Sequence, residues 1–254
     1  MLENPFFKIF FSPYDIRRAM PDIWDGFGTN VKLMIYAEVL ILAFALVLAV
    51  MRGLPGRRAA PLRWLVIAYC DFFRGTPVVL IAFVTTLGLP ALAQNSDSGI
   101  SHWIGSQSLL VYGILALVIV YSAYVAEVYR AGIDSVHPSQ RMAARSLGLG
   151  YGQMMRHVIL PQAIRRVIPP LLNDFIGLQK DSAIIGVVGV TEAVQQAQTY
   201  STTFGNFSGY MVAAVLFVYI TIPLARYTDG LINRRERLER AQALASPPSS
   251  RSTA

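Results

Sequence analysis

Cysteine, lysine and charged residues are all scarce in this 254-residue chain, and each scarcity excludes a class of protein. Cys70 is the single cysteine, so a disulfide framework is impossible, and a lone cysteine among apolar residues is most often a packing residue. The three lysines, Lys8, Lys32 and Lys180, do not follow a glycine-rich loop, which excludes a Walker A nucleotide site. Charged residues make up 15% of the chain and apolar residues 54%, so an ordinary soluble domain is excluded as well.

Long runs without charge are present instead. Residues 75–96 and 201–225 contain no charged side chain, residues 99–126 contain only His102, and residues 31–51 contain only Lys32 and Glu38. A bilayer core is crossed by about 20 apolar residues in a helix. The sequence therefore predicts an all-α integral membrane protein with about five transmembrane helices in a domain spanning 26–232. The expected spans are 31–51, 64–93, 109–129, 167–190 and 209–232.

The two ends of the chain have a different character. Residues 1–25 contain an aromatic stripe with helical spacing, typical of a short anchoring helix in the membrane interface, and Pro13 is expected to interrupt it. They lack the order of a cleaved signal peptide. Residues 233–254 are expected to form a cytoplasmic tail whose final ASPPSSRSTA has the composition of disorder.

Arginine is distributed unevenly among the connections between the expected spans. The connections 52–74 and 130–166 and the C-terminal segment are rich in arginine, whereas 94–108 and 191–208 contain neither Lys nor Arg. The formal net charge of +7 could suggest nucleic-acid binding, but the basic residues lie beside apolar spans. The positive-inside rule then places the basic connections and the C-terminus in the cytoplasm and the N-terminus outside.

The connection from His137 to Pro161 reads HPSQRMAARSLGLGYGQMMRHVILP. His137 and Pro138 predict a helix start, because proline is well suited to the first helical position. Gly148 and Gly150 are expected to supply the positive φ that ends this helix. A second short segment, 153–160, is expected to run up to Pro161.

Ala143, Ala144 and Leu147 form a small apolar face on the first of these helices, and Gln140 and Arg145 point away from this face. Such a hairpin between membrane spans is suited to being gripped by another protein. An ordinary cytoplasmic loop that reverses the chain is equally compatible with the pattern.

This connection resembles the coupling loop of ATP-binding-cassette importer permeases, whose pattern is Glu-Ala-Ala, three residues, Gly, nine residues, Ile, one residue, Leu-Pro. Here it reads Met142-Ala143-Ala144, then Gly148, and finally 158–161, Val-Ile-Leu-Pro. The segments YCDFFRGTP, AYVAEVYRAGIDSV and LPQAIRRVIPPLLNDFIGLQKDSAI narrow the resemblance to the polar amino acid branch. It covers roughly residues 26–230, and several independent motifs occur in the right order.

The resemblance implies a type I importer permease fold and a cytoplasmic coupling helix. It implies these coupling residues: Met142, Ala143, Ala144, Arg145, Ser146, Leu147 and Gly148. Met142 replaces the family's glutamate and removes a charge that could pair with a cation on the ATPase. Because an exposed ion pair contributes only about 0–1 kcal/mol, small-residue packing can still sustain docking.

The resemblance also implies the partners of this chain. They are an ATPase dimer that binds the loop and holds ATP and Mg, an extracytoplasmic solute-binding protein, and a second permease subunit, identical or paralogous. No cofactor is expected on the chain itself. The expected location is a prokaryotic plasma membrane.

Polar residues at membrane depth are costly and usually face the bundle interior or a water-filled path. The candidates for a substrate path are Glu38, Asn173, Asp174 and Gln179, with Asp174 suited to an ammonium group. Glu38 could instead bond a neighbouring helix. Lys180 and Asp181 are interpreted as a local pair or as caps of a helix break.

The sequence contains no catalytic constellation and no metal-ligand spacing, so an enzyme is the least favoured class. Glu127 and Arg130, three residues apart, predict a surface ion pair. An ion-coupled secondary carrier remains the alternative to the importer, because the polar fourth span suggests a broken helix. The absence of an inverted repeat argues against that alternative.

Overall fold

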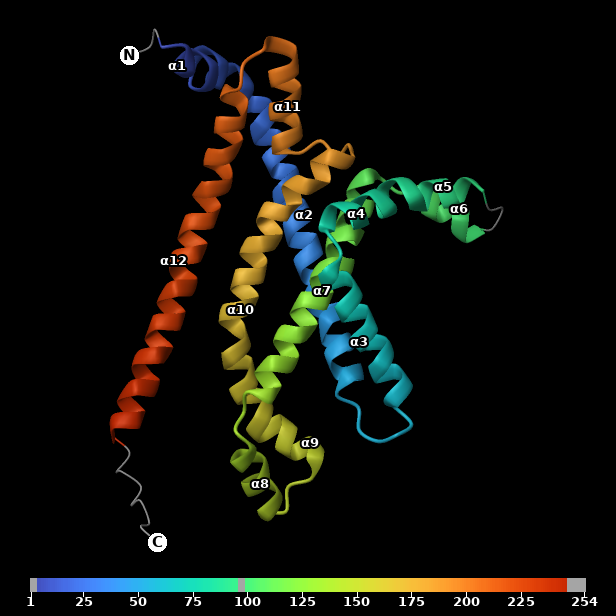
Figure 1. Cartoon of the computed structure of the whole chain (residues 1–254), viewed down its shortest axis with the longest axis vertical. Coiled ribbons are helices and arrows are strands. Elements are labelled where there is room, and N and C mark those ends of the chain that lie inside the picture. Colours follow the sequence, from blue (N-terminus) through green and yellow to red (C-terminus); the bar gives the residue numbers. More distant parts are fainter. Residues whose placement is uncertain (1–3, 96–98, 246–254) are drawn as a thin grey trace.

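The computed structural model describes residues 4–95 and 99–245, and within these residues the chain is helical with no strand. The last nine residues of the expected C-terminal tail lie outside the described residues. The elements, in order (Figure 1), are α1 Pro5–Phe10, α2 Pro13–Arg52, α3 Ala60–Gly75, α4 Val78–Phe83, η1 Val84–Gly88, α5 Leu89–Gln94, α6 Gly99–Gly105, α7 Leu109–Asp134, α8 Pro138–Ser146, α9 Tyr151–Met154, η2 Met155–Ile159, α10 Leu160–Asp181, η3 Ser182–Val188, α11 Ala193–Phe204 and α12 Ser208–Ala245. The expected all-α architecture is confirmed.

The first long helix begins much earlier than the sequence suggested. The aromatic stripe is interrupted at Pro13, as expected: α1 ends at Phe10, Pro13 occupies the first turn of α2, and Ser12 caps α2 by accepting a hydrogen bond from the Asp15 amide at 3.3 Å. Proline suits this position because its missing N–H would be unpaired there in any case. The predicted interfacial segment therefore contains α1 and the start of α2, and α2 extends through the predicted boundary at residue 26.

The predicted span 64–93 is sharply bent. The axes of Ala60–Gly75 and Val78–Gln94 differ by 104°, with the break at the Gly75–Pro77 position where the sequence predicted a bend. The second half contains the π-helical turn η1 before α5. Figure 1 shows α5 and α6 projecting sideways from the bundle, so residues 64–93 do not form one straight span.

The break in α10 lies in a different place from its prolines. Pro169 and Pro170 are inside a helix that continues to Asp181. The chain then tightens into the 3₁₀ segment η3, which ends at Gly189 with a left-handed φ of 96°. Mid-helix 3₁₀ segments often mark hinges. The predicted span 167–190 thus consists of the end of α10 together with η3.

By length and hydropathy, three helical segments of the described chain can cross a membrane: Pro5–Arg52, Leu109–Asp134 and Ser208–Arg234. The bent pair brings the number to four if it is one span. α10 does not meet this criterion, because it contains charged side chains such as Arg166, Asp174 and Lys180. It nevertheless runs between α7 and α12 in the bundle (Figure 1).

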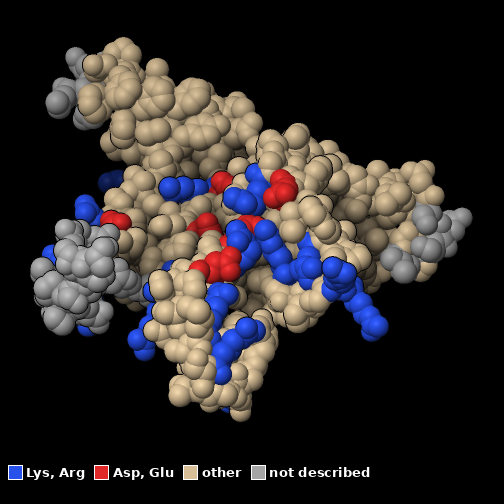
Figure 2. Space-filling view, turned by 60° about the horizontal axis from the view of Figure 1, so that its bottom comes forward, with Lys and Arg blue, Asp and Glu red and all other residues tan. Residues whose placement is uncertain are grey.

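The two ends of the bundle differ in charge. Figure 1 places α1 and α11 at one end, and α8, α9, the α2–α3 connection and the end of α12 at the other. In Figure 2, which turns this second end forward, Lys and Arg side chains gather over it around a smaller group of acidic ones. The connections that the sequence assigned to one side of the membrane therefore share one end of the molecule.

The core is built around α7, which packs extensively against α2 and α10. Leu33, Ile41, Leu117 and Val120 are fully buried in its main cluster. A second cluster joins α2, α11 and α12 at the upper end, and a third lies under the α8–α9 hairpin. Every part of the bundle is thus connected to α7 or α2.

Gly132 allows the closest approach of α7 to α10. A Cβ atom at this position would overlap the Cγ1 atom of Val167 on α10. Since packed interiors do not yield freely to added atoms, this contact requires a residue without a side chain.

Gly132→Ala should lower the free energy of unfolding by about 1–3 kcal/mol, because it overpacks the α7–α10 contact. Thermal unfolding of the purified protein in detergent measures the effect. Val167→Ala should restore part of the loss in the double variant. Gly28→Ala is the control, since a Cβ atom there meets nothing within 4 Å and alanine favours a helix. Equal stability of Gly132→Ala and wild type would contradict the packing assignment.

Candidate functional site

The connection 137–161 forms a helical hairpin whose first half matches the prediction. α8 begins with Pro138 in its first turn, and the Ser139 amide donates to Nδ1 of His137 at 3.2 Å. Gly148 has a φ of 76°, as expected at the end of a helix. Gly150 does not have the positive φ that the sequence predicted. Its φ is −65°, and its amide donates to Oε1 of Gln153 at 3.1 Å, so Gly150 starts the next helix.

The second half of the hairpin does not end at Pro161. α9 continues through the π-helical turn η2 directly into α10, and Pro161 lies in the first turn of α10. One helical path therefore leads from Tyr151 at the hairpin to Asp181.

The side chains of α8 divide into a buried and an exposed group. Ala144 is 3% exposed and packs with Val136, Met154, Ile159 and Ala163 in the cluster under the hairpin. Met142 and Leu147 are 62% and 79% exposed. Ala143, Arg145, Ser146 and Gly148 are exposed as well. Ala144 therefore packs inside the hairpin, whereas the other six predicted coupling residues are exposed.

Two arginines fix the hairpin to the end of α7, an arrangement that the sequence did not reveal. Nη2 of Arg141 donates to the carbonyl of Ile133 at 2.8 Å, and Nη1 of Arg166 donates to the carbonyl of Ser135. Carbonyl groups at a helix C-terminus have no partner within the helix, and basic side chains are suitable donors to them. Because Arg141 lies on α8 and Arg166 on α10, these bonds join three elements.

The predicted ion pair between Glu127 and Arg130 is present at 2.9 Å and belongs to a larger group. Arg52, at the end of α2, also pairs with Glu127, and Arg130 pairs with Asp134 at 2.7 Å. Glu127 is 15% exposed, so this pairing is partly shielded from solvent. The group ties the ends of α2 and α7 together just above the hairpin.

Glu38 on α2 and Asp174 on α10 lie on two helices of the bundle that contact each other. Each of the two residues is only partly exposed. Oδ2 of Asp174 is buried and has no hydrogen-bond partner in the described chain. Buried polar atoms are rarely left unpaired without a functional reason. A buried carboxylate oxygen without a partner is suited to a cationic ligand.

The other two candidates for a substrate path lie elsewhere. Gln179 is 3% exposed and faces α12, where its Oε1 accepts from Thr221 Oγ1 at 2.7 Å and its Nε2 donates to the Phe217 carbonyl at 3.4 Å. Asn173 is exposed. Gln179 therefore joins two helices, and among the four candidates only Asp174 has a buried oxygen without a partner in the described chain.

Asp181 has a partner that the sequence did not suggest. The hydroxyl of Tyr121 on α7 donates to its Oδ2 at 2.8 Å, 60 residues away in the chain. Among the described residues no ion pair joins Lys180 to Asp181. A tyrosine in a uniformly apolar span gives no periodic signal, so the contact becomes visible only in the fold.

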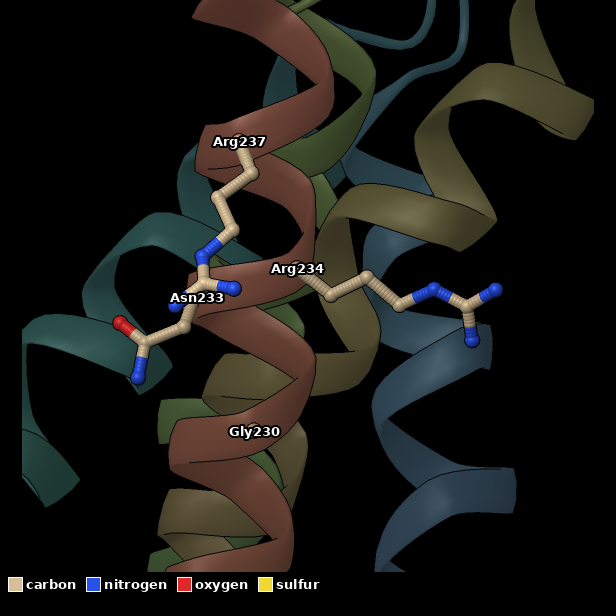
Figure 3. A pocket seen from close by; sticks show the side chains of 4 residues that line it. All are labelled: Gly230, Asn233, Arg234 and Arg237. Atoms are coloured by element: carbon tan, nitrogen blue, oxygen red, sulfur yellow. The ribbon is translucent and has the colours of Figure 1, made fainter.

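A hollow of about 440 Å³ lies on the lower part of α12, lined by Gly230, Asn233, Arg234 and Arg237. Figure 3 shows Arg234 pointing away to one side of the helix and Asn233 and Arg237 to the other. All four residues belong to α12, and their side chains do not converge on a common point. This hollow therefore lacks the arrangement of a ligand site.

Comparison with known proteins identifies the family. Residues 41–238 match the model of the "Binding-protein-dependent transport system inner membrane component" family, to which this chain belongs. The "Probable glutamine ABC transporter permease protein GlnM" of Bacillus subtilis is 42% identical over 84% of this chain and 93% of its own length. The glutamate transport system permease GluC of Corynebacterium glutamicum is 34% identical over 86% and 94%, respectively.

Solved structures agree with this assignment. The "Crystal structure of an amino acid ABC transporter with histidines" contains a chain that superposes with a TM-score of 0.74 at 31% identity, over 86% of this chain and 95% of that one. The methionine transporter MetNI matches with a TM-score of 0.62 at 18% identity, which shows the shared fold. The resemblance to importer permeases is confirmed, and the chain is a multi-pass membrane transport component, not an ATPase.

Ala144→Arg should lower the free energy of unfolding by about 2–5 kcal/mol, because it places a large charged side chain in the cluster under the hairpin. Ala143→Arg, one residue away but exposed, should leave stability within about 0.5 kcal/mol of wild type. Thermal unfolding and limited proteolysis between residues 137 and 161 distinguish the two. If both variants were equally stable, the buried assignment of Ala144 would be wrong.

Proposed function

We propose that this chain is the permease subunit of an importer for a polar amino acid, driven by ATP hydrolysis on partner subunits. The exposed apex of the hairpin supports this most directly, because Met142 and Leu147 present large apolar side chains at a basic, water-facing end of the molecule. Exposed apolar patches of this kind mark protein–protein contacts. Curated relatives are described as permeases for glutamine, glutamate and arginine.

The orientation follows from the same distribution of charge. Under the positive-inside rule, the end with the arginine-rich connections faces the cytoplasm, together with the C-terminal part of α12. The N-terminal helices and α11 then face outside a prokaryotic plasma membrane. In this orientation an ATPase dimer with ATP and Mg docks on the hairpin from the cytoplasm, and a solute-binding protein docks from outside. A second permease subunit, identical or paralogous, completes the membrane unit.

The contacts within the chain suggest how ATP hydrolysis drives transport. A force on α8 reaches α7 through the bond from Arg141 to the Ile133 carbonyl, and reaches α10 through Arg166 and the buried cluster around Ala144. Alternating access requires two packed states and partners that favour one of them. Nucleotide on the ATPase and a loaded binding protein would each favour the outward-open state.

The substrate path is proposed to pass Glu38 and Asp174, with the free carboxylate oxygen of Asp174 receiving an ammonium group. A charge-assisted hydrogen bond of this kind is stronger than a neutral one. Asn173 lies one residue away and is exposed, so it can contribute an amide to the same path. Gln179 is assigned to the joint between α10 and α12 instead.

Ala143→Arg should abolish capture of an ATP-binding subunit in a tagged pull-down from native membranes, with proteins identified by mass spectrometry. The variant keeps the fold but places a bulky cation on the docking surface. Ser139→Arg, exposed on the first turn of α8 and outside the predicted coupling residues, is the matched control. Recovery of the chain without any ATPase from wild-type membranes, with uptake that follows an ion gradient, would instead support a secondary carrier.

Asp174→Asn should reduce ATP-dependent amino acid uptake into proteoliposomes by at least about tenfold, since it removes the charge offered to the ammonium group. Capture of the ATPase should be unchanged, because Asp174 is remote from the hairpin surface. Asp22→Asn, an exposed aspartate on α2, is the control for the same chemical change. Full uptake by Asp174→Asn would remove this residue from the path.

A further inference from the structure

Asn30 and Glu192 form a buried polar joint between α2 and α11. The Glu192 carboxylate accepts from Nδ2 of Asn30 at 3.0 Å, from the Val194 amide at 2.9 Å and from the Gln195 amide at 2.7 Å. Oδ1 of Asn30 accepts from the Ala193 amide at 3.0 Å. The first three amides of α11 are therefore all bonded, one of them to a residue of another helix.

The joint is sealed from solvent. Glu192 is 0% exposed and Asn30 is 3% exposed. Burial raises the pKa of the Glu192 carboxyl above its ordinary value, and the three hydrogen bonds that it accepts oppose this effect. A carboxylate that only accepts hydrogen bonds matches the three donors that face it. Removal of one partner would leave a buried polar group unpaired, which costs more than the bond contributes.

Glycines on both neighbouring elements allow this close packing. A Cβ atom on Gly26 of α2 would lie 2.7 Å from the backbone carbon of Glu192. A Cβ atom on Gly186 of η3 would overlap the Glu192 carboxylate. Backbone and side chain of Glu192 are thus closely packed against α2 and η3.

The same joint reaches the break at the end of α10. Nδ2 of Asn30 also donates to Oγ of Ser182 at 3.0 Å, and this hydroxyl donates to the Gln179 carbonyl at 2.7 Å. Ser182 follows Asp181, the residue that Tyr121 bonds. Asn30 therefore holds both the start of α11 and the point at which α10 becomes the 3₁₀ segment η3.

We propose that Asn30 and Glu192 are positioning residues that keep α2, η3 and α11 together as one rigid unit in every transport state. The turn at Asp181–Ser182 then becomes the fixed upper end of α10, against which the rest of that helix moves. This proposal takes the transport cycle from the proposed function, but the joint itself exists independently of any partner.

Hydrogen–deuterium exchange of the wild-type complex tests the proposal without any substitution. The complex is reconstituted in nanodiscs and measured nucleotide-free and after trapping with ATP and vanadate. Exchange in peptides covering residues 193–195 should be equally slow in both states, within about twofold. A decrease in protection of about tenfold or more in either state would show that the joint opens, and would overturn the proposal.

Glu192→Gln should speed exchange at residue 194 or residue 195 by at least about tenfold, because glutamine keeps one acceptor oxygen and its NH₂ group would face the donors that the other carboxylate oxygen accepts from. Uptake should fall while ATPase capture is retained. Asp25→Asn is the matched control, because Asp25 is an exposed acid on α2, the helix that contains Asn30. Wild-type exchange and uptake in Glu192→Gln would also overturn the proposal.

If no ATPase is captured at all, the proposed function fails, and exchange in the permease alone still tests the joint.

Discussion

A chain that crosses a bilayer must satisfy its own backbone N–H and C=O groups, because the hydrocarbon offers no partners. Long helices meet this requirement along most of the molecule, and the exceptions are the places where helices begin, end or break. At two of these places side chains from elsewhere supply the missing partner: Arg141 and Arg166 at the end of α7, and Asn30 at the start of α11. The same bonds join helices that are far apart in the sequence.

Long-range contacts of this kind explain what the sequence could and could not predict. The helix start at Pro138, the turn at Gly148 and the Glu127–Arg130 pair are all local, and each was predicted correctly. Pro161 was misinterpreted as a stop because a proline in the first turn of a helix and a proline after a helix look alike in the sequence.

The candidate site shows the same division on a smaller scale. The hairpin and the carboxyl groups could be selected from the sequence because their residue types are unusual where they occur. The direction in which their side chains point could not be predicted from the sequence. Ala143 and Ala144 are adjacent and identical, and only the cluster formed with Met154 and Ile159 makes the second one structural. Gln179 is polar at membrane depth, but Thr221 lies 42 residues further on, so its role as a helix joint depends on how α12 folds back.

The arrangement of α10 relates these observations to one another. It begins at the hairpin, passes Asp174 at mid-height, and ends at the turn held by Tyr121 and Asn30. If its upper end is fixed and its lower end follows the hairpin, displacement is smallest at Asp181 and largest near Leu160. Asp174 lies between them, where it moves relative to Glu38 on α2. A carboxyl pair whose separation changes with the position of the hairpin would bind a cationic group more tightly in one state than in the other, and such differential affinity is what couples binding to a conformational equilibrium.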